Sequence, residues 1–113
     1  MMKEYTVITS TDQVDRFIKD HPLSFIYISR ENCGVCTSLF PKIRNLLTKF
    51  PNIRLGFIDA DQVTEIAGKF SVFTVPVLLF FVDGKEVLRE ARFVHTDALE
   101  KQLEKIYELA GNN

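Results

Sequence analysis

The sequence predicts an α/β domain with a mixed central β-sheet flanked by helices on both faces. Short β-prone runs alternate with segments of helical periodicity, which is typical of parallel strands joined by helical crossovers. One run, residues 23–29, is nearly all apolar or β-prone, as in a central strand covered on both faces. Asp83-Gly84 is a strong two-residue hairpin signal. The hairpin adds an antiparallel pair and makes the predicted sheet mixed.

The first third of the chain predicts a strand, a helix and the central strand. Residues 5–8 are a short β-prone run. Ser10 or Thr11 can cap the helix that follows. His21-Pro22 ends this helix, because a residue before proline avoids the α conformation. The apolar side chains of the helix share one face: Val14, Phe17 and Ile18.

The middle of the chain predicts a longer helix and a third strand. After residues 30–36, apolar side chains recur at helical spacing: Leu39, Ile43, Leu46, Leu47 and Phe50. Pro41 lies inside this pattern and is expected to kink the helix. Pro51 and Asn52 are expected to stop it after Phe50. Residues 53–59 form the third predicted strand.

The last part predicts a short helix, the hairpin and a closing helix. The short helix places four apolar side chains on one face: Val63, Ile66, Ala67 and Phe70. Residues 77–82 and 86–91 are the strands of the hairpin. The closing helix is amphipathic, with an apolar face made by Leu99, Leu103, Ile106, Tyr107 and Ala110. Asp97 and Glu100 resemble a capping box at its start. The predicted order is β-α-β-α-β-α-β-β-α.

Size and charge limit the function classes. The 113 residues suit a single domain, taken as residues 1–113. There are 14 basic and 15 acidic residues and no polybasic run, so a nucleic-acid or anionic-membrane partner is not expected. No apolar stretch approaches the ~18 residues of a membrane span, and the N-terminus lacks the apolar centre of a secretory signal. We therefore expect a cytoplasmic monomer.

The cysteines, Cys33 and Cys36, point to chemistry. A secreted disulfide scaffold would carry more cysteines, and a bridge between these two closes too small a loop to stabilise the fold much. Cys33 follows the central strand at the predicted start of a helix, where unpaired N–H groups and the helix dipole favour its thiolate. Cys33 would attack a substrate disulfide, and Cys36 would resolve the mixed disulfide. Gly34 is expected to keep the turn tight and to leave room for a docking partner.

Several features recur together in one known family. They are Cys33-Gly34-Val35-Cys36 after a buried strand, Pro41 within the next helix, Val75-Pro76 before an apolar strand, the hairpin and the closing helix. Over roughly residues 5–110 the chain thereby resembles a thioredoxin.

This resemblance implies a fold, an activity and partners. It implies the thioredoxin fold, a cis Val75–Pro76 bond and a thiol–disulfide oxidoreductase that reduces protein disulfides. No organic cofactor or metal is implied beyond the redox-active cysteine pair. The implied partners are client proteins with disulfides and a flavin-dependent reductase of the thioredoxin-reductase type as electron donor. The implied substrate site comprises Gly34, Val35, Thr74, Val75 and Pro76.

The chain also departs from the family pattern. Around the cysteines, Asn32 stands where thioredoxins have Trp, and Val35 stands where they have Pro. Tyr27 occupies the position of a buried Asp, and Phe57 occupies the position of the Lys that accompanies this Asp. Arg92 stands where thioredoxins have a glycine near the groove. Because the Asp helps to move the proton when Cys36 attacks, we expect a slower resolving step unless Tyr27, Asp59 or water substitutes. Val35 is expected to make the potential less reducing than the roughly −270 mV of thioredoxin. Arg92 is expected to narrow the groove or to add charge to it.

Other interpretations stay open. The missing Asp and Trp also fit a binding module that docks clients without turnover, and the motif also fits an oxidase, an isomerase or a reductant of one partner. A metal shared between two chains is a further alternative, since a closed zinc site needs about four ligands and only His21 and His95 could join the cysteines within one chain. Phe73 and Phe93 either border the active-site groove or pack in the core.

Overall fold

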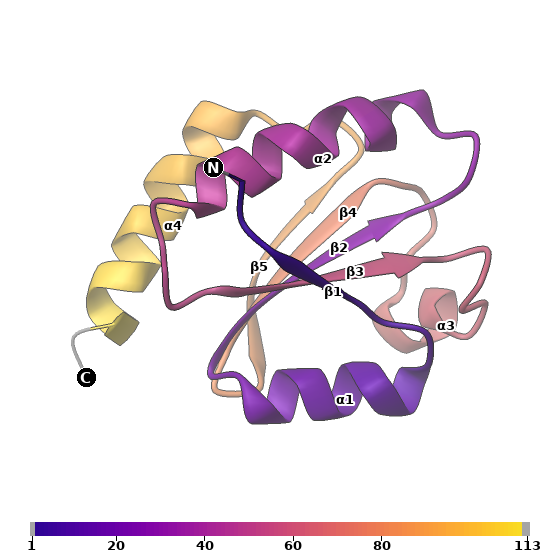
Figure 1. Ribbon diagram of the computed structural model, residues 1–113, viewed down its shortest axis with the longest axis horizontal. Coiled ribbons are helices and arrows are strands. Elements are labelled where there is room, and N and C mark those ends of the chain that lie inside the picture. Colours follow the sequence, from indigo (N-terminus) through magenta and orange to yellow (C-terminus); the bar gives the residue numbers. More distant parts are fainter. Residues whose placement is uncertain (1, 112–113) are drawn as a thin grey trace.

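The structure, a computed structural model, describes residues 2–111 and has the predicted order of elements (Figure 1). The strands are β1 (Tyr5–Val7), β2 (Leu23–Ser29), β3 (Arg54–Asp59), β4 (Val77–Val82) and β5 (Lys85–Ala91). The helices are α1 (Thr11–Asp20), α2 (Gly34–Leu47), α3 (Ile66–Phe70) and α4 (Thr96–Gly111). Over residues 2–111, no helix is long and apolar enough to cross a bilayer.

The sheet is mixed, as predicted. Within residues 2–111 it has five strands in the order β1-β3-β2-β4-β5. β3 pairs in parallel with β1 on one side and β2 on the other, whereas β4 is antiparallel to both β2 and β5. β1 meets β3 over a short stretch, from Tyr5 opposite Leu55 to Val7 opposite Phe57. Helices α2 and α4 cover one face, and α1 and α3 cover the other (Figure 1).

β2 supplies apolar side chains to the core on both faces of the sheet. Phe25 and Tyr27 pack on the side of α2 and α4, and Ile26 and Ile28 pack on the side of α1 and α3. This alternation is the two-residue period of a β-strand. Every residue of β2 is buried, which confirms a central strand. Its carboxyl end leads directly into the segment that carries Cys33, so that segment is attached to a fully buried strand.

The hairpin between β4 and β5 is confirmed. Asp83 and Gly84 have positive φ values of 50° and 84°, which is the backbone of a type I′ two-residue turn. Asp83 also donates its backbone N–H to the carbonyl of Pro22 at 2.8 Å. The turn is thereby anchored to the start of β2, at the end of the sheet that lies away from the cysteines.

Helix α2 ends earlier than its apolar pattern predicted. It stops at Leu47 rather than Phe50. The backbone N–H groups of Thr48, Lys49 and Phe50 instead bond to carbonyls three residues back, at 3.0–3.2 Å, which is the tighter 3₁₀ pattern. Pro51 explains this, because it disfavours the α conformation at the residue before it. Phe50 is nevertheless buried, as its place in the pattern predicted.

Two details of α3 and α4 were predicted wrongly. Ala67 is exposed rather than on the buried face of α3, because this five-residue helix turns only Ile66 fully into the core. α4 begins at Thr96, so Asp97 lies within its first turn and is not the cap. The carbonyl of His95 instead accepts the first helical bond, from the N–H of Leu99 at 3.0 Å. An acidic side chain in the first turn still suits the helix dipole.

Candidate active site

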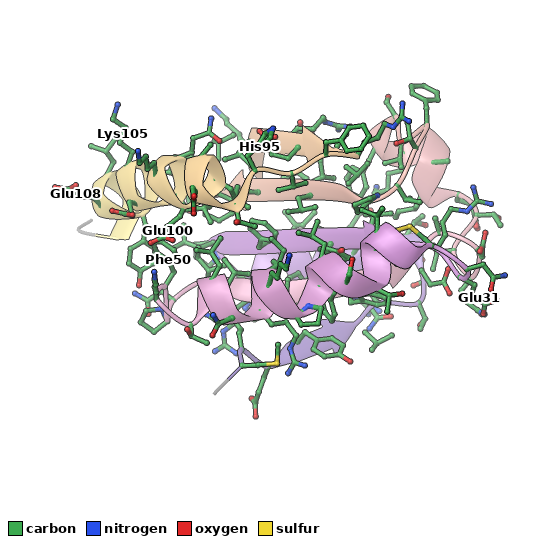
Figure 2. The ribbon with its side chains drawn as sticks, turned by 90° about the horizontal axis from the view of Figure 1, so that it is seen from above. Glu31, Phe50, His95, Glu100, Lys105 and Glu108 are labelled. Atoms are coloured by element: carbon green, nitrogen blue, oxygen red, sulfur yellow. A yellow bond between two sulfur atoms is a disulfide. The ribbon has the colours of Figure 1, made fainter. Side chains whose placement is uncertain are left out.

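The cysteine pair lies at the N-terminal end of α2. Cys33 and Cys36 are joined by a disulfide, with their Cα atoms 5.3 Å apart. Figure 2 shows this bond at the start of the helix, next to the turn that carries Glu31. That turn contains Asn32 at a positive φ of 57°, a conformation that asparagine adopts more readily than most residues. The chain therefore leaves β2, reverses at Asn32 and enters α2 at the cysteines.

The two sulfurs differ in their exposure to solvent. Cys36 is fully buried, at 0% exposure, whereas Cys33 is partly exposed. A disulfide of another protein can therefore reach Cys33 but not Cys36. Cys36 is instead placed to react with Cys33. This difference is what the predicted roles of nucleophile and resolving thiol require.

The start of α2 is built to hold a negative charge on Cys33. Cys33 is the N-cap, and its Sγ accepts a hydrogen bond from the backbone N–H of Cys36 at 3.2 Å. The first turn of α2 contains no acidic residue, so nothing there opposes the helix dipole. In the reduced protein the same N–H and dipole favour the Cys33 thiolate over the thiol.

Gly34 has a simpler role than the sequence suggested. A Cβ at this position would meet no atom within 4 Å, so the turn does not need a glycine in order to be tight. The other expectation, that Gly34 leaves room for a docking partner, stays a prediction. Val35 beside Gly34 is on the surface, with a relative exposure of 52%.

The loop before β4 lies beside the carboxyl end of β2, because Val77 at the start of β4 pairs with Ile28. The Val75–Pro76 peptide bond is cis, as expected. Pro76 is buried, and its carbonyl accepts the backbone N–H of Arg92 at 2.9 Å. The backbone of Val75 has no hydrogen-bond partner within residues 2–111. An extended peptide can pair with such free backbone groups as an added strand. Thr74 is exposed beside it.

Tyr27 fills the position where thioredoxins carry a buried acid. Its side chain is fully buried, and its hydroxyl donates a hydrogen bond to the backbone carbonyl of Cys36 at 2.7 Å. Its ring packs against Phe40, with ring centroids 4.8 Å apart, and stacks on Phe57 at 6.1 Å. Burial raises the pKa of the Tyr27 phenol, so the phenol stays protonated and cannot serve as a base for Cys36. It supports the helix that holds the cysteine.

Asp59 is engaged elsewhere. Its carboxylate accepts the backbone N–H of Asp61 at 2.8 Å, at the end of β3. The carboxylate of Asp61 in turn bonds to Arg30 at 3.0 Å and to the backbone N–H of Glu31 at 3.2 Å. This chain of contacts ties the end of β3 to the turn before the cysteines. It gives Asp59 and Asp61 a structural role in positioning that turn.

Two grooves are relevant to the cysteine motif in the part of the chain that the structure describes: one includes Arg30, from the segment before the motif, and the other includes Val35 of the motif itself. One, of about 260 Å³, includes Val75 and Thr74 and is called here the Thr74 groove; its walls are Arg30, Ala60, Asp61, Thr64, Ala67, Val72, Phe73, Thr74 and Val75. The other, of about 300 Å³, begins at Val35 and is called the Arg92 groove; its walls are Val35, Ser38, Leu39, Lys42, Arg92, Phe93, Val94 and His95.

Phe73 and Phe93 lie at these grooves and not in the core. Phe73 is 91% exposed and Phe93 is 74% exposed, so the groove alternative is right for both. Sequence reasoning missed Lys42, Ser38 and His95 as groove residues. Helical periodicity offered a partial signal, since Ser38 and Lys42 follow Val35 at spacings of three and seven residues and so share its face of α2.

The histidines are separated from the cysteines. His21 follows α1 and packs its ring against Phe17, with ring centroids 4.8 Å apart. His95 lies at the start of α4, on the side of the sheet that α2 covers (Figure 2). Within residues 2–111, no three His, Cys, Asp or Glu side chains gather closely enough to hold a metal ion.

Comparison with known proteins gives a consistent picture. The thioredoxin family model matches residues 5–105. A thioredoxin-like protein of Bacillus subtilis, YdfQ, is 57% identical over 108 residues, covering 96% of each chain. A thioredoxin of Chlamydia pneumoniae is 34% identical over 82 residues, covering 73% of this chain and 79% of the relative. The solved thioredoxin of Fasciola hepatica superposes with a TM-score of 0.78 at 28% identity, covering 88% of this chain and 97% of the other.

Proposed function

This chain belongs to the thioredoxin family, and we propose that it reduces disulfides in client proteins through its Cys33–Cys36 pair. The family, the fold and the paired cysteines indicate thiol–disulfide exchange. The unequal exposure of the two sulfurs is the observation that carries the proposal furthest. Cys33 can reach a client disulfide, whereas the buried Cys36 can react only with Cys33. This arrangement suits a reaction in which the client disulfide is reduced and the Cys33–Cys36 disulfide forms.

The reaction has two exchange steps. The Cys33 thiolate attacks one sulfur of the client disulfide, and the other client sulfur leaves as a thiolate. The Cys36 thiolate then attacks Cys33, forms the Cys33–Cys36 disulfide and releases the first client sulfur as a thiolate. Two electrons pass from the protein to the client, and the two client thiolates take up protons from solvent. A separate dithiol donor returns the protein to its reduced form.

The surroundings of Cys36 shape the second step. Because the Tyr27 phenol stays protonated, it does not provide the base that the family's buried acid would provide at Cys36. The proton of Cys36 then passes to solvent, to the departing client thiolate or to Asp59. We therefore propose that the resolving step is slower than the first step. We also propose that a flavin-dependent reductase supplies the electrons, that the protein works in the cytoplasm and that it acts as a monomer.

Trapping the mixed disulfide tests the reaction. The Cys36→Ser variant keeps the nucleophile but cannot resolve the intermediate, so with insulin as the client it should accumulate a covalent adduct that dithiothreitol releases. The Cys33→Ser variant is the matched control and should form far less adduct, because Cys36 is buried. Mass spectrometry of the intact protein measures both. If Cys36→Ser forms no adduct while its Cys33 thiol is free, the binding-module alternative is right.

The redox potential tests the direction. Equilibration of the protein with glutathione or dithiothreitol buffers, followed by counting of free thiols, gives the potential of the pair. A value near about −270 mV supports a reductant. A value above about −200 mV would instead assign the protein to oxidation or isomerisation of disulfides.

A further inference from the structure

We propose that the Arg92 groove selects clients by charge, binding an acidic segment of polypeptide that flanks the client's reactive cysteine. The inference rests on the proposed function, because the segment reaches the groove only when its cysteine engages Cys33. Arg92 and Lys42 would be the residues that determine this specificity.

The position of the groove links it to the reacting sulfur. Val35 belongs to the cysteine motif and also forms one end of the groove. The wall on one side continues along α2 to Lys42, and the other wall is the connection from Arg92 to His95 between β5 and α4. Residues next to a cysteine bound at Cys33 therefore lie over Val35 and can enter the groove.

The charges in the groove have one sign. Lys42 and Arg92 line it, and none of the walls described above is acidic. The Lys42 and Arg92 side chains form no ion pair or hydrogen bond with another residue in the range 2–111. Elsewhere Lys49 is paired with Glu100 at 2.8 Å, and Arg89 is paired with Glu86 at 2.9 Å. The cations of the groove are thus free to meet a carboxylate.

The position of Arg92 is fixed by its backbone and by the neighbouring Phe93 ring. Its backbone has a positive φ of 64°, and its N–H is bonded to the carbonyl of Pro76. Its guanidinium lies 5.4 Å from the centre of the Phe93 ring, a cation–π contact that keeps the donors at the surface. A guanidinium can bind a carboxylate through two parallel hydrogen bonds. The exposed ring of Phe93 adds apolar area beside that charge.

The Thr74 groove differs from the Arg92 groove in its charge. Its one cation, within the residues that form its walls, is Arg30, and Arg30 is paired with Asp61 of the same groove at 3.0 Å. The pair cancels most of the local charge. The protein as a whole carries a net charge of −1, so long-range attraction does not favour acidic clients. A preference for acid must therefore come from the Arg92 groove itself.

Matched peptides test the proposal. Two peptides differ in whether Asp and Glu or their amides Asn and Gln flank a single cysteine, which is held as a mixed disulfide with 5-thio-2-nitrobenzoate. Attack of reduced Cys33 on the peptide sulfur releases the coloured thiolate, and its appearance gives the second-order rate constant. We expect the acidic peptide to react about tenfold faster at low salt, and the advantage to shrink at about 1 M salt, where screening is strong.

Variants locate the effect. Arg92→Gly removes the charge and suits the positive φ, and Lys42→Glu reverses a charge on the surface of α2. Each should reduce the preference to about twofold or less. Lys101→Glu makes the same charge change on the exposed face of α4, outside the walls of the groove, and should leave the preference unchanged.

The outcomes separate the two proposals. Equal rates with both peptides, or a preference that Arg92→Gly and Lys42→Glu leave unchanged, would overturn the charge selection while the exchange activity stands. Failure of the reduced protein to react with either peptide would overturn the proposed function and the charge selection together.

Discussion

Removal of one buried hydroxyl tests the role of Tyr27. In Tyr27→Phe the ring keeps its contacts with Phe40 and Phe57, and the hydrogen bond of 2.7 Å to the Cys36 carbonyl is lost. A neutral hydrogen bond contributes about 0.5–1.5 kcal/mol, and a carbonyl left unsatisfied in the interior costs about 1–3 kcal/mol. We expect the free energy of unfolding to fall by about 1–2 kcal/mol, measured by urea titration of the oxidised protein.

The same variant changes the pH dependence of stability. Burial raises the pKa of the Tyr27 phenol in the folded state, so the folded protein retains this proton at pH values where the unfolded chain has lost it. The contribution of the Tyr27 phenol to the free energy of unfolding is present below the ordinary tyrosine pKa of about 10, and it is lost as pH rises above that value. We therefore expect the stability difference between wild type and Tyr27→Phe to narrow above about pH 10.

Kinetics then distinguish a supporting phenol from a catalytic one. If Tyr27 only supports α2, the rate at which Cys36 resolves a mixed disulfide will show the same pH midpoint in both proteins between about pH 6 and pH 9, around the ordinary thiol pKa. Stopped-flow measurement of client release provides that rate. A shifted midpoint would show that the phenol takes part in proton transfer and would refute the supporting role.

Tyr107→Phe is the matched control for the stability measurement. The Tyr107 hydroxyl accepts the backbone N–H of Asn52 at 3.3 Å at an exposed site, where water can replace it. Its loss should cost no more than about 0.5 kcal/mol. Equal stability of wild type and Tyr27→Phe would refute the energetic argument for the buried bond.

Three further changes have defined outcomes. Val35→Pro removes an unpaired N–H from the first turn beside Cys33. The Cys33 thiolate is then less stabilised, so the redox potential of the cysteine pair should fall by about 20–30 mV. A higher potential in glutathione buffers would contradict this. Gly56→Ala places a Cβ 2.6 Å from the Ile8 side chain and should cost about 1–3 kcal/mol in urea, whereas Gly68→Ala, with open space, should cost nothing or stabilise α3 by up to about 1 kcal/mol. Phe73→Ser should change stability by less than about 0.5 kcal/mol and reduce kcat/KM for insulin by about fivefold, and an unchanged kcat/KM would show that this exposed ring does not contact clients.

The elements could be predicted because each depends on nearby residues. Each signal lies within a few neighbouring positions of the sequence. These signals are the spacing of apolar residues, the Asp83-Gly84 turn and the apolar run at residues 23–29. The cysteines could be placed for the same reason, since a strand leading into a helix defines where Cys33 lies. The end of α2 was missed because Phe50 fits the helical period even though Pro51 prevents the α conformation there.

The grooves depend on residues that are distant along the chain. Lys42 and Arg92 line the same groove only because the connection after β5 passes beside α2, and no local pattern contains that information. Phe73 and Phe93 lie outside the regular elements, so periodicity could not decide whether they were buried. The contact of Tyr27 with Cys36 likewise required the packed structure.

The short pairing of β1 with β3 has a consequence for the order in which the protein folds. Tyr5 and Val7 must find partners about fifty residues away, whereas β4 and β5 are joined by a two-residue turn. Closing a long loop costs more entropy than closing a hairpin, and all three residues of β1 are exposed. The β1 strand should therefore dock late and open often, and its amide hydrogens should exchange with solvent well before those of β2. The redox site is attached to β2, so fluctuations of this edge leave the cysteines in place.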